Sequence, residues 1–154
     1  MTRSERMQPI KSLADTRERD AGTVVAGARR VLEEREKQLE QLRAYRAEYA
    51  ARAAQQGAAD AVRLQNYHAF LGRLADAVRQ QQELVEAARQ DLERKTADWQ
   101  QRRVEAASLG KVVERIARAA RRRSSRPARH GRARAARAAD ARLTLARPLQ
   151  AGRA

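Results

Sequence analysis

The sequence predicts an all-α protein in which residues 1–116 form two long helices paired as an antiparallel coiled-coil hairpin. A basic, disordered C-terminal tail is expected at 117–154. Aromatic residues make up 3 % of the chain and charged residues 34 %, which can supply a narrow seam between helices but not a layered core. Proline occurs only at Pro9, Pro127 and Pro148, so the long stretch between the first two is free to be helical. An apolar heptad repeat in the second half indicates supercoiling.

The first helix is expected at about residues 10–54. Its apolar stripe is less regular than that of the second helix, and two successive four-residue steps around Arg35 indicate a stutter. Gly22 and Gly27 each weaken this helix by roughly 1 kcal/mol relative to alanine. We therefore expect it to need its partner in order to form. The stripe comprises Ile10, Leu13, Arg17, Ala21, Val24, Ala28, Val31, Arg35, Leu39, Leu42, Tyr45 and Tyr49.

A turn is expected at about residues 55–60, between the two stripes. Gly57 is a natural helix end, because glycine adopts the left-handed C-terminal conformation without steric cost. Asp60 is suited to cap the next helix, whose first backbone N–H groups lack partners. A break this short folds the two helices back antiparallel.

The second helix, at about residues 61–120, carries the clearest signal. Alternating steps of three and four residues meet an apolar or aromatic side chain at thirteen of sixteen positions. A repeat of this length without a slip predicts a left-handed supercoil. Pairing about the turn places Tyr49 near Tyr67 and Leu13 near Trp99. The sixteen positions are Leu64, Tyr67, Leu71, Leu74, Val78, Gln81, Val85, Ala88, Leu92, Lys95, Trp99, Arg102, Ala106, Leu109, Val113 and Ile116.

Residues 117–154 differ in character from the rest of the chain. Residues 1–116 hold 22 Lys and Arg against 18 Asp and Glu, whereas the tail holds 12 Arg against one acid, Asp140. Dense like charge and low hydrophobicity predict disorder. Because Glu and Lys vanish abruptly near Ile116, one interpretation is a frameshifted reading of a GC-rich gene. Two others stay open: a native basic tail that binds RNA or anionic lipid, and a native but inert disordered tail.

No pattern of catalytic, cofactor-binding or metal-ligating residues is present in the sequence, so we expect no enzyme activity, no cofactor and no metal. The chain has no cysteine, and its two histidines, His68 and His130, belong to no acid–histidine cluster. The N-terminus lacks the apolar run of a signal peptide, and no window approaches a membrane span. These absences favour a cytosolic protein.

Four of the five aromatic residues flank the expected turn. They are Tyr45, Tyr49, Tyr67 and Phe70. The heptad repeat places Leu71 in the seam and leaves Phe70 beside it at a more exposed angle. An exposed Phe in a chain with a single Phe indicates a partner contact. The residues alone also allow the alternative, in which the cluster fills the seam.

Two stretches resemble the flagellar type III export protein family FliJ: EKQLEQLRAYRAEY at 36–49 and NYHAFLGRLADAVRQQQ at 66–82. The resemblance covers about residues 5–116. It implies an antiparallel coiled coil similar to the γ stalk of rotary ATPases. Such a protein docks on the hexameric export ATPase FliI, toward the joined termini, and contacts the export gate protein FlhA. It helps flagellar subunits or their chaperones reach the gate, in the cytoplasm and peripherally at the inner membrane.

The same resemblance implies a gate-contacting surface of two stripes, which the hairpin would bring side by side. Gln81 departs from the family pattern, which can carry His at that position. The tail departs most, because a family C-terminus continues as a mixed-charge helix. A stalk protein of a virulence type III secretion system and a nucleic-acid-binding coiled coil that uses the basic tail are the alternative functions. The stripes are Gln38, Leu42, Tyr45 and Tyr49 on the first helix, and Phe70, Leu74, Ala77 and Gln81 on the second.

Overall fold

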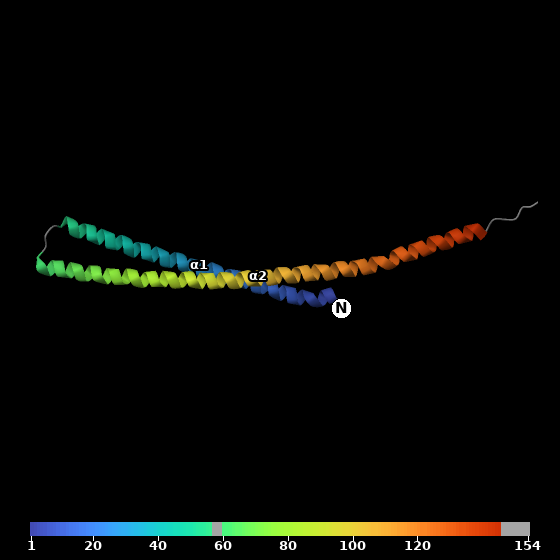
Figure 1. Ribbon diagram of the computed structural model, residues 1–154, viewed down its shortest axis with the longest axis horizontal. Helices are drawn as coiled ribbons and strands as arrows, with labels where there is room; N and C mark the ends of the chain where they lie inside the picture. The colour runs from blue at the N-terminus through green and yellow to red at the C-terminus, as the bar shows by residue number, and fades with distance from the viewer. Residues whose placement is uncertain (57–59, 146–154) are drawn as a thin grey trace, which may run out of the picture. The chain divides into compact units, whose positions relative to one another are not determined.

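Two helices make up the regular structure: α1 (Arg3–Gln55) and α2 (Ala61–Leu145), drawn in Figure 1. This computed structural model describes residues 1–56 and 60–145, and of 126–133 and 142–145 it describes the backbone alone. Every regular element within those ranges is helical, which confirms the predicted all-α fold.

The chain forms two compact units. Residues 12–107 are one unit, and residues 1–11 with 108–154 are the other. Within residues 12–107, α1 and α2 lie side by side and run in opposite directions (Figure 1). The predicted antiparallel pairing of two long helices is therefore confirmed.

The start of α1 is set by a capping box. The backbone N–H of Glu5 donates to the Thr2 hydroxyl at 3.2 Å, and the Thr2 N–H donates to the Glu5 carboxylate in return. α1 consequently begins at Arg3, earlier than the predicted start at about residue 10. Pro9 lies inside the helix as a result, and not in its first turn.

The N-terminus of α2 is capped by Asp60, as the sequence predicts. Its Oδ1 accepts a hydrogen bond from the backbone N–H of Arg63 at 2.8 Å, and its carbonyl oxygen accepts one from Leu64 at 3.1 Å. α1 ends at Gln55. The helix end predicted at Gly57 lies outside the described residues.

The seam of α2 follows the predicted repeat closely. Fifteen of the sixteen predicted positions are buried or half-buried, and the exception is Leu64, which is 51 % exposed at the start of the helix. None of the described side chains is completely enclosed, because a two-helix seam shields each residue from one side only. The most buried apolar side chains are Ala21, Val25, Ala28, Leu39, Leu74, Val78, Val85 and Val113.

The seam of α1 differs from the predicted apolar stripe. Val24 and Val31 are 49 % and 50 % exposed, whereas their neighbours Val25 and Leu32 lie in the seam. The steps from Ala21 to Leu39 then alternate regularly between four and three residues, so the predicted stutter is absent. Each valine is followed by a second apolar residue, and packing against α2 selects the one in phase with the regular repeat.

The end of α2 also differs from the prediction. The sequence predicts a helix end near residue 120 and a disordered tail, whereas α2 continues to Leu145. Alanine and arginine dominate this stretch and are among the best helix formers, which favours a helical backbone. The side chains at 134–141 are all exposed.

Candidate protein-binding surface

An aromatic cluster joins α1 to α2 next to the turn. The Phe70 ring centroid lies 4.4 Å from that of Tyr49 and 6.2 Å from that of Tyr45, whose ring meets Phe70 edge-on at 86°. Tyr49 stacks on Tyr67 at 5.5 Å, which confirms their predicted proximity. Phe70 is half-buried by the two tyrosines, and Tyr45, at 48 %, is the exposed member of the cluster.

Heptad geometry gives the seam two unlike edges within residues 12–107. The first edge is the row of positions that flanks the seam on the side of Tyr45 and Phe70: Arg17, Val24, Val31, Gln38 and Tyr45 of α1, with Phe70, Ala77, Leu84, Asp91 and Asp98 of α2. The second edge is the opposite row: Gly22, Arg29, Glu36, Arg43 and Ala50 of α1, with Ala75, Gln82, Arg89, Thr96 and Arg103 of α2.

The eight residues implied by the resemblance divide between these positions. Leu42, Tyr49, Leu74 and Gln81 occupy the seam, whereas Gln38, Tyr45, Phe70 and Ala77 occupy the first edge. Leu74 and Gln81 are only 7 % and 8 % exposed. The structure thus brings all eight to one side of the hairpin, and Tyr45 is the exposed member of the set.

Gln81 is a polar residue inside the seam. Its Nε2 donates to the backbone carbonyl of Arg35 at 3.0 Å and to the side-chain oxygen of Gln38 at 3.2 Å. Both bonds cross from α2 to α1, so burial of this amide is compensated. A polar seam residue with a fixed partner favours one alignment of the two helices.

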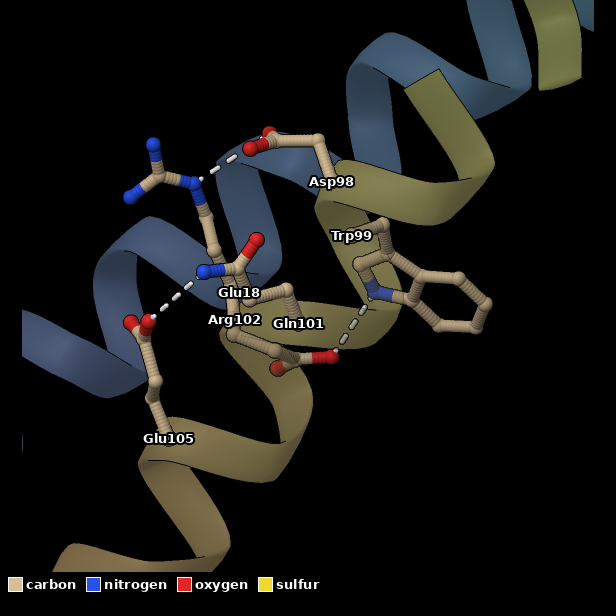
Figure 2. Close-up of polar contacts among 6 residues, drawn as sticks. All are labelled: Glu18, Asp98, Trp99, Gln101, Arg102 and Glu105. Atoms are coloured by element: carbon tan, nitrogen blue, oxygen red, sulfur yellow. Dashed lines mark hydrogen bonds and ion pairs between the residues drawn. The ribbon is translucent and has the colours of Figure 1, made fainter. Parts of the chain in front are cut away.

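Trp99 forms a second interhelical cluster, farther from the turn. Figure 2 shows its indole Nε1, which donates to the Glu18 carboxylate of α1 at 3.0 Å. The ring also lies against Gly22, where a Cβ atom would sit 3.2 Å from Nε1, and under the guanidinium of Arg103 at 5.6 Å from the ring centroid. The predicted pairing of Trp99 with Leu13 is wrong, and Leu13 is 52 % exposed.

Ion pairs around Trp99 lie along α2 itself. Arg102 Nε contacts the Asp98 carboxylate at 3.2 Å, and Gln101 donates to Glu105 at 3.4 Å, as Figure 2 also shows. On the second edge, Arg89 bridges to Glu36 of α1 at 3.1 Å. Of these contacts, the one between Arg89 and Glu36 joins the two helices, and the others act within α2.

The described residues hold no group of three or more His, Asp or Glu side chains suited to a metal ion. A hollow of about 760 Å³ near the turn is lined by Tyr49, Arg52, Arg63 and Tyr67, among others. Its polar groups are two arginines, two tyrosine hydroxyls and amides, without an acid. These surfaces present aromatic rings, guanidinium groups and hydrogen-bonding side chains.

The family described as "Flagellar FliJ protein" matches residues 3–127. The chain belongs to this family. No curated protein and no solved structure matches it. The FliJ match includes both stretches that carry the resemblance and extends past Ile116 into the first residues of the predicted tail.

Membership of the FliJ family makes the chain a component of flagellar protein export. The family consists of export components and not of enzymes. Within the part of the chain that the structure describes, neither helix has a stretch long and apolar enough to cross a membrane.

The Glu18–Trp99 contact is the main feature that the sequence-based interpretation missed. Glu18 lies in phase with Ala21 and Val25, so a repeat read without a stutter would have placed it in the seam. A carboxylate is favourable in the seam only opposite a donor, and here that donor is the indole N–H.

Proposed function

We propose that this FliJ-family chain links the export ATPase FliI to the export gate protein FlhA and assists the delivery of export substrates or their chaperones. Family membership supports the role in export. We assign the gate contact to the first edge around Tyr45 and Phe70. We assign the ATPase contact to residues 1–11 and the adjoining start of 108–154. The site of action is the cytoplasmic face of the inner membrane, where the chain would be peripheral.

The observation that carries the gate assignment is the contact between Tyr45 and Phe70. The two rings meet edge to face, and Tyr45 keeps about half of its surface in water. Aromatic side chains held rigid by a neighbour supply large contact area at low entropic cost, and they are enriched among residues that dominate binding energy. A partner that covers Tyr45 would bury the half of its surface that the hairpin leaves in water.

The burial of the eight residues divides their roles. Leu74 and Gln81 are too enclosed to reach a partner and instead hold the two helices in place beneath it. Tyr45, and the half-buried Gln38, Phe70 and Ala77, would form the contact itself. Substitution of a seam residue would therefore act through the fold, and substitution of an edge residue would act through binding.

The test is the affinity of the purified full chain for the FlhA cytoplasmic domain, measured by isothermal titration calorimetry. The double variant Tyr45→Ala/Phe70→Ala should bind at least about tenfold more weakly, which corresponds to the loss of roughly 1.4 kcal/mol. The control is Val62→Ala, which removes an apolar side chain that is 66 % exposed on the outer face of α2.

Far-UV circular dichroism of each variant should show the helix content of the parent chain. The double variant should also keep its affinity for FliI, because the ATPase contact is assigned to the other unit. Unchanged affinity of the double variant for FlhA would overturn the gate assignment. Equal losses for FlhA and FliI would indicate a defect of the fold.

A further inference from the structure

The first edge carries further exposed apolar side chains beyond the aromatic cluster, separated from it by one layer that contains Gln38 and Ala77. Val24 and Val31 of α1 are 49 % and 50 % exposed, and Leu84 of α2 is 44 % exposed. These three side chains lie next to seam residues in the sequence but are not themselves part of the seam. They extend the surface around Tyr45 and Phe70 along the same side of residues 12–107.

The heptad repeat places Val31 opposite Leu84. Val31 lies two heptads before Tyr45 on α1, and Leu84 lies two heptads after Phe70 on α2. Because the helices are antiparallel and Tyr45 contacts Phe70, the same shift along each helix brings Val31 and Leu84 to the same level of the hairpin. Their seam neighbours agree with this alignment, since Leu32 packs against the core cluster that contains Val85.

The second edge has a different composition. Its middle section consists of Arg29, Glu36 and Arg43 on α1 and Gln82 and Arg89 on α2. The ion pair of Glu36 with Arg89 crosses this edge and closes it with solvated charges. An apolar partner would have to break that pair, so the first edge is the more apolar of the two within residues 12–107. Two adjacent helices leave a shallow groove along such an edge.

Opposite charges border the groove of the first edge. The next heptad position outward on α1 holds Asp20, Glu34 and Glu48, and on α2 it holds Arg73 and Arg94. All five side chains are exposed. Glu34 and Arg73 form no ion pair with another described residue, and Glu48 and Arg94 pair only along their own helices. The intervening border positions are uncharged, with Gly27 and Gln41 on α1 and Gln80 and Ala87 on α2. Asp91, on the first edge opposite Val24, is paired with Arg94 and Lys95 of its own helix. The α1 border is thus net acidic and the α2 border net basic.

We infer that the first edge from Tyr45 and Phe70 to Val24 and Leu84 holds one amphipathic α-helix of the gate protein, an inference that rests on the proposed function. The bound helix would carry apolar residues at three- and four-residue spacing, basic residues on the side that faces α1 and acidic residues on the side that faces α2. From Val24 to Tyr45 the groove spans roughly 30 Å at about 1.5 Å per residue, which fits a helix of about 20 residues.

A helix suits this groove better than an extended strand. The backbone groups of α1 and α2 are satisfied within their own helices, so no free sheet edge exists for a strand to join. Two parallel cylinders leave a groove into which the ridge of a third helix packs at a spacing of about 8–10 Å.

A second copy of the chain is the weaker occupant. A stable homodimer buries about 800 Å² on each partner. Four partly exposed apolar side chains, two of them valines, supply a minority of that area. A groove of this size with charged borders is suited to a reversible contact whose specificity comes from charge.

The experiment compares edge variants of the full chain in their binding to the FlhA cytoplasmic domain by titration calorimetry. The double variant Val31→Gln/Leu84→Gln should weaken binding about tenfold. Glutamine is a good helix former, and both positions are already half exposed, so the fold should persist. Val62→Gln is the matched control on the outer face.

Charge reversal tests the orientation of the bound helix. Glu34→Lys and Arg73→Glu should each weaken binding several-fold at low salt and less at high salt. Gln41→Lys and Gln80→Glu, which alter neighbouring exposed positions of the same borders by one charge, should change affinity by about half as much. Equal affinity of Glu34→Lys and Arg73→Glu with the parent would overturn the charged-helix proposal.

The outcomes separate the two proposals. If the parent chain does not bind FlhA, the proposed function fails and this inference fails with it. If Tyr45→Ala/Phe70→Ala weakens binding while Val31→Gln/Leu84→Gln does not, the gate assignment stands and the extended groove is overturned. If the parent sediments as a dimer that Val31→Gln/Leu84→Gln converts to a monomer, the occupant is a second copy and the inference is overturned.

Discussion

The indole Nε1 of Trp99 on α2 donates a hydrogen bond to the carboxylate of Glu18 on α1 at 3.0 Å. Both side chains are half-buried, so a carboxylate stands in the seam at a position where the repeat calls for an apolar residue. The bond compensates the burial of both polar groups and fixes which turn of α1 faces Trp99.

Replacement of Glu18 should reveal the contribution of this bond. We expect Glu18→Ala to lower the free energy of unfolding by about 1 kcal/mol, because the half-buried indole N–H loses its acceptor. Urea titration followed by circular dichroism measures the change. Glu93→Ala, an exposed position on α2, is the control, and an equal loss in both variants would show that the bond contributes nothing specific.

Gly22 and Gly27 form a matched pair for testing how closely Trp99 packs. A Cβ at Gly27 would meet nothing within 4 Å, so Gly27→Ala should stabilise the chain by about 0.5–1 kcal/mol through helix propensity. A Cβ at Gly22 would lie 3.2 Å from the indole Nε1, so Gly22→Ala should stabilise less and alter the tryptophan emission. Equal gains in thermal stability, with emission unchanged, would contradict the packing described.

We expect Gln81 to lower the stability of the hairpin while it fixes the alignment of α1 with α2. Gln81→Leu replaces a buried amide by an apolar side chain of similar size, and we expect a gain of about 0.5–1 kcal/mol. The variant should also lose the bonds to Arg35 and Gln38 that favour one alignment, so sedimentation should show more association at equal concentration. A lower unfolding midpoint for Gln81→Leu, relative to the exposed control Gln80→Leu, would mean that the hydrogen bonds outweigh the apolar burial.

The C-terminal part of α2 should be dispensable for the hairpin. Truncation after Arg126 removes residues beyond nearly all of the family match, and the described side chains at 134–141 are exposed. We expect the unfolding midpoint of the truncated chain to lie within about 1 °C of the parent, because none of the described side chains that the truncation removes is buried. Truncation after Ala107 removes the buried Val113 and is the destabilised comparison.

The seam of α2 was predictable because its repeat keeps one phase over sixteen positions. Several steps offer two adjacent apolar residues, such as Leu84 with Val85, but singly placed ones such as Leu92 and Trp99 decide the face. The seam of α1 was not, because Val24 with Val25 and Val31 with Leu32 offer two phases one residue apart. Sequence periodicity cannot rank such neighbours. Packing against α2 places Val25 and Leu32 in the seam and leaves Val24 and Val31 exposed on the first edge.

Other differences have distinct physical origins. The capping box of Thr2 with Glu5 was readable in the sequence, and its recognition would have moved the predicted helix start. The Glu18 contact was not readable, since a buried carboxylate is favourable only when its donor is known. Of the candidate surface, the sequence indicated the aromatic cluster, but the exposure of Tyr45 in place of Phe70 depends on how the rings pack.

No described side chain of this hairpin is completely enclosed, and the best-shielded cluster is the small group of Leu39, Val78 and Val85. Each layer of the seam contacts chiefly the layers above and below it, so its free energy is nearly a sum of local terms, as in a zipper. Fraying then proceeds inward from the ends at little cost per step. Amide hydrogens around Leu39 and Val85 should be the last to exchange with solvent, and those beyond Ile116 among the first.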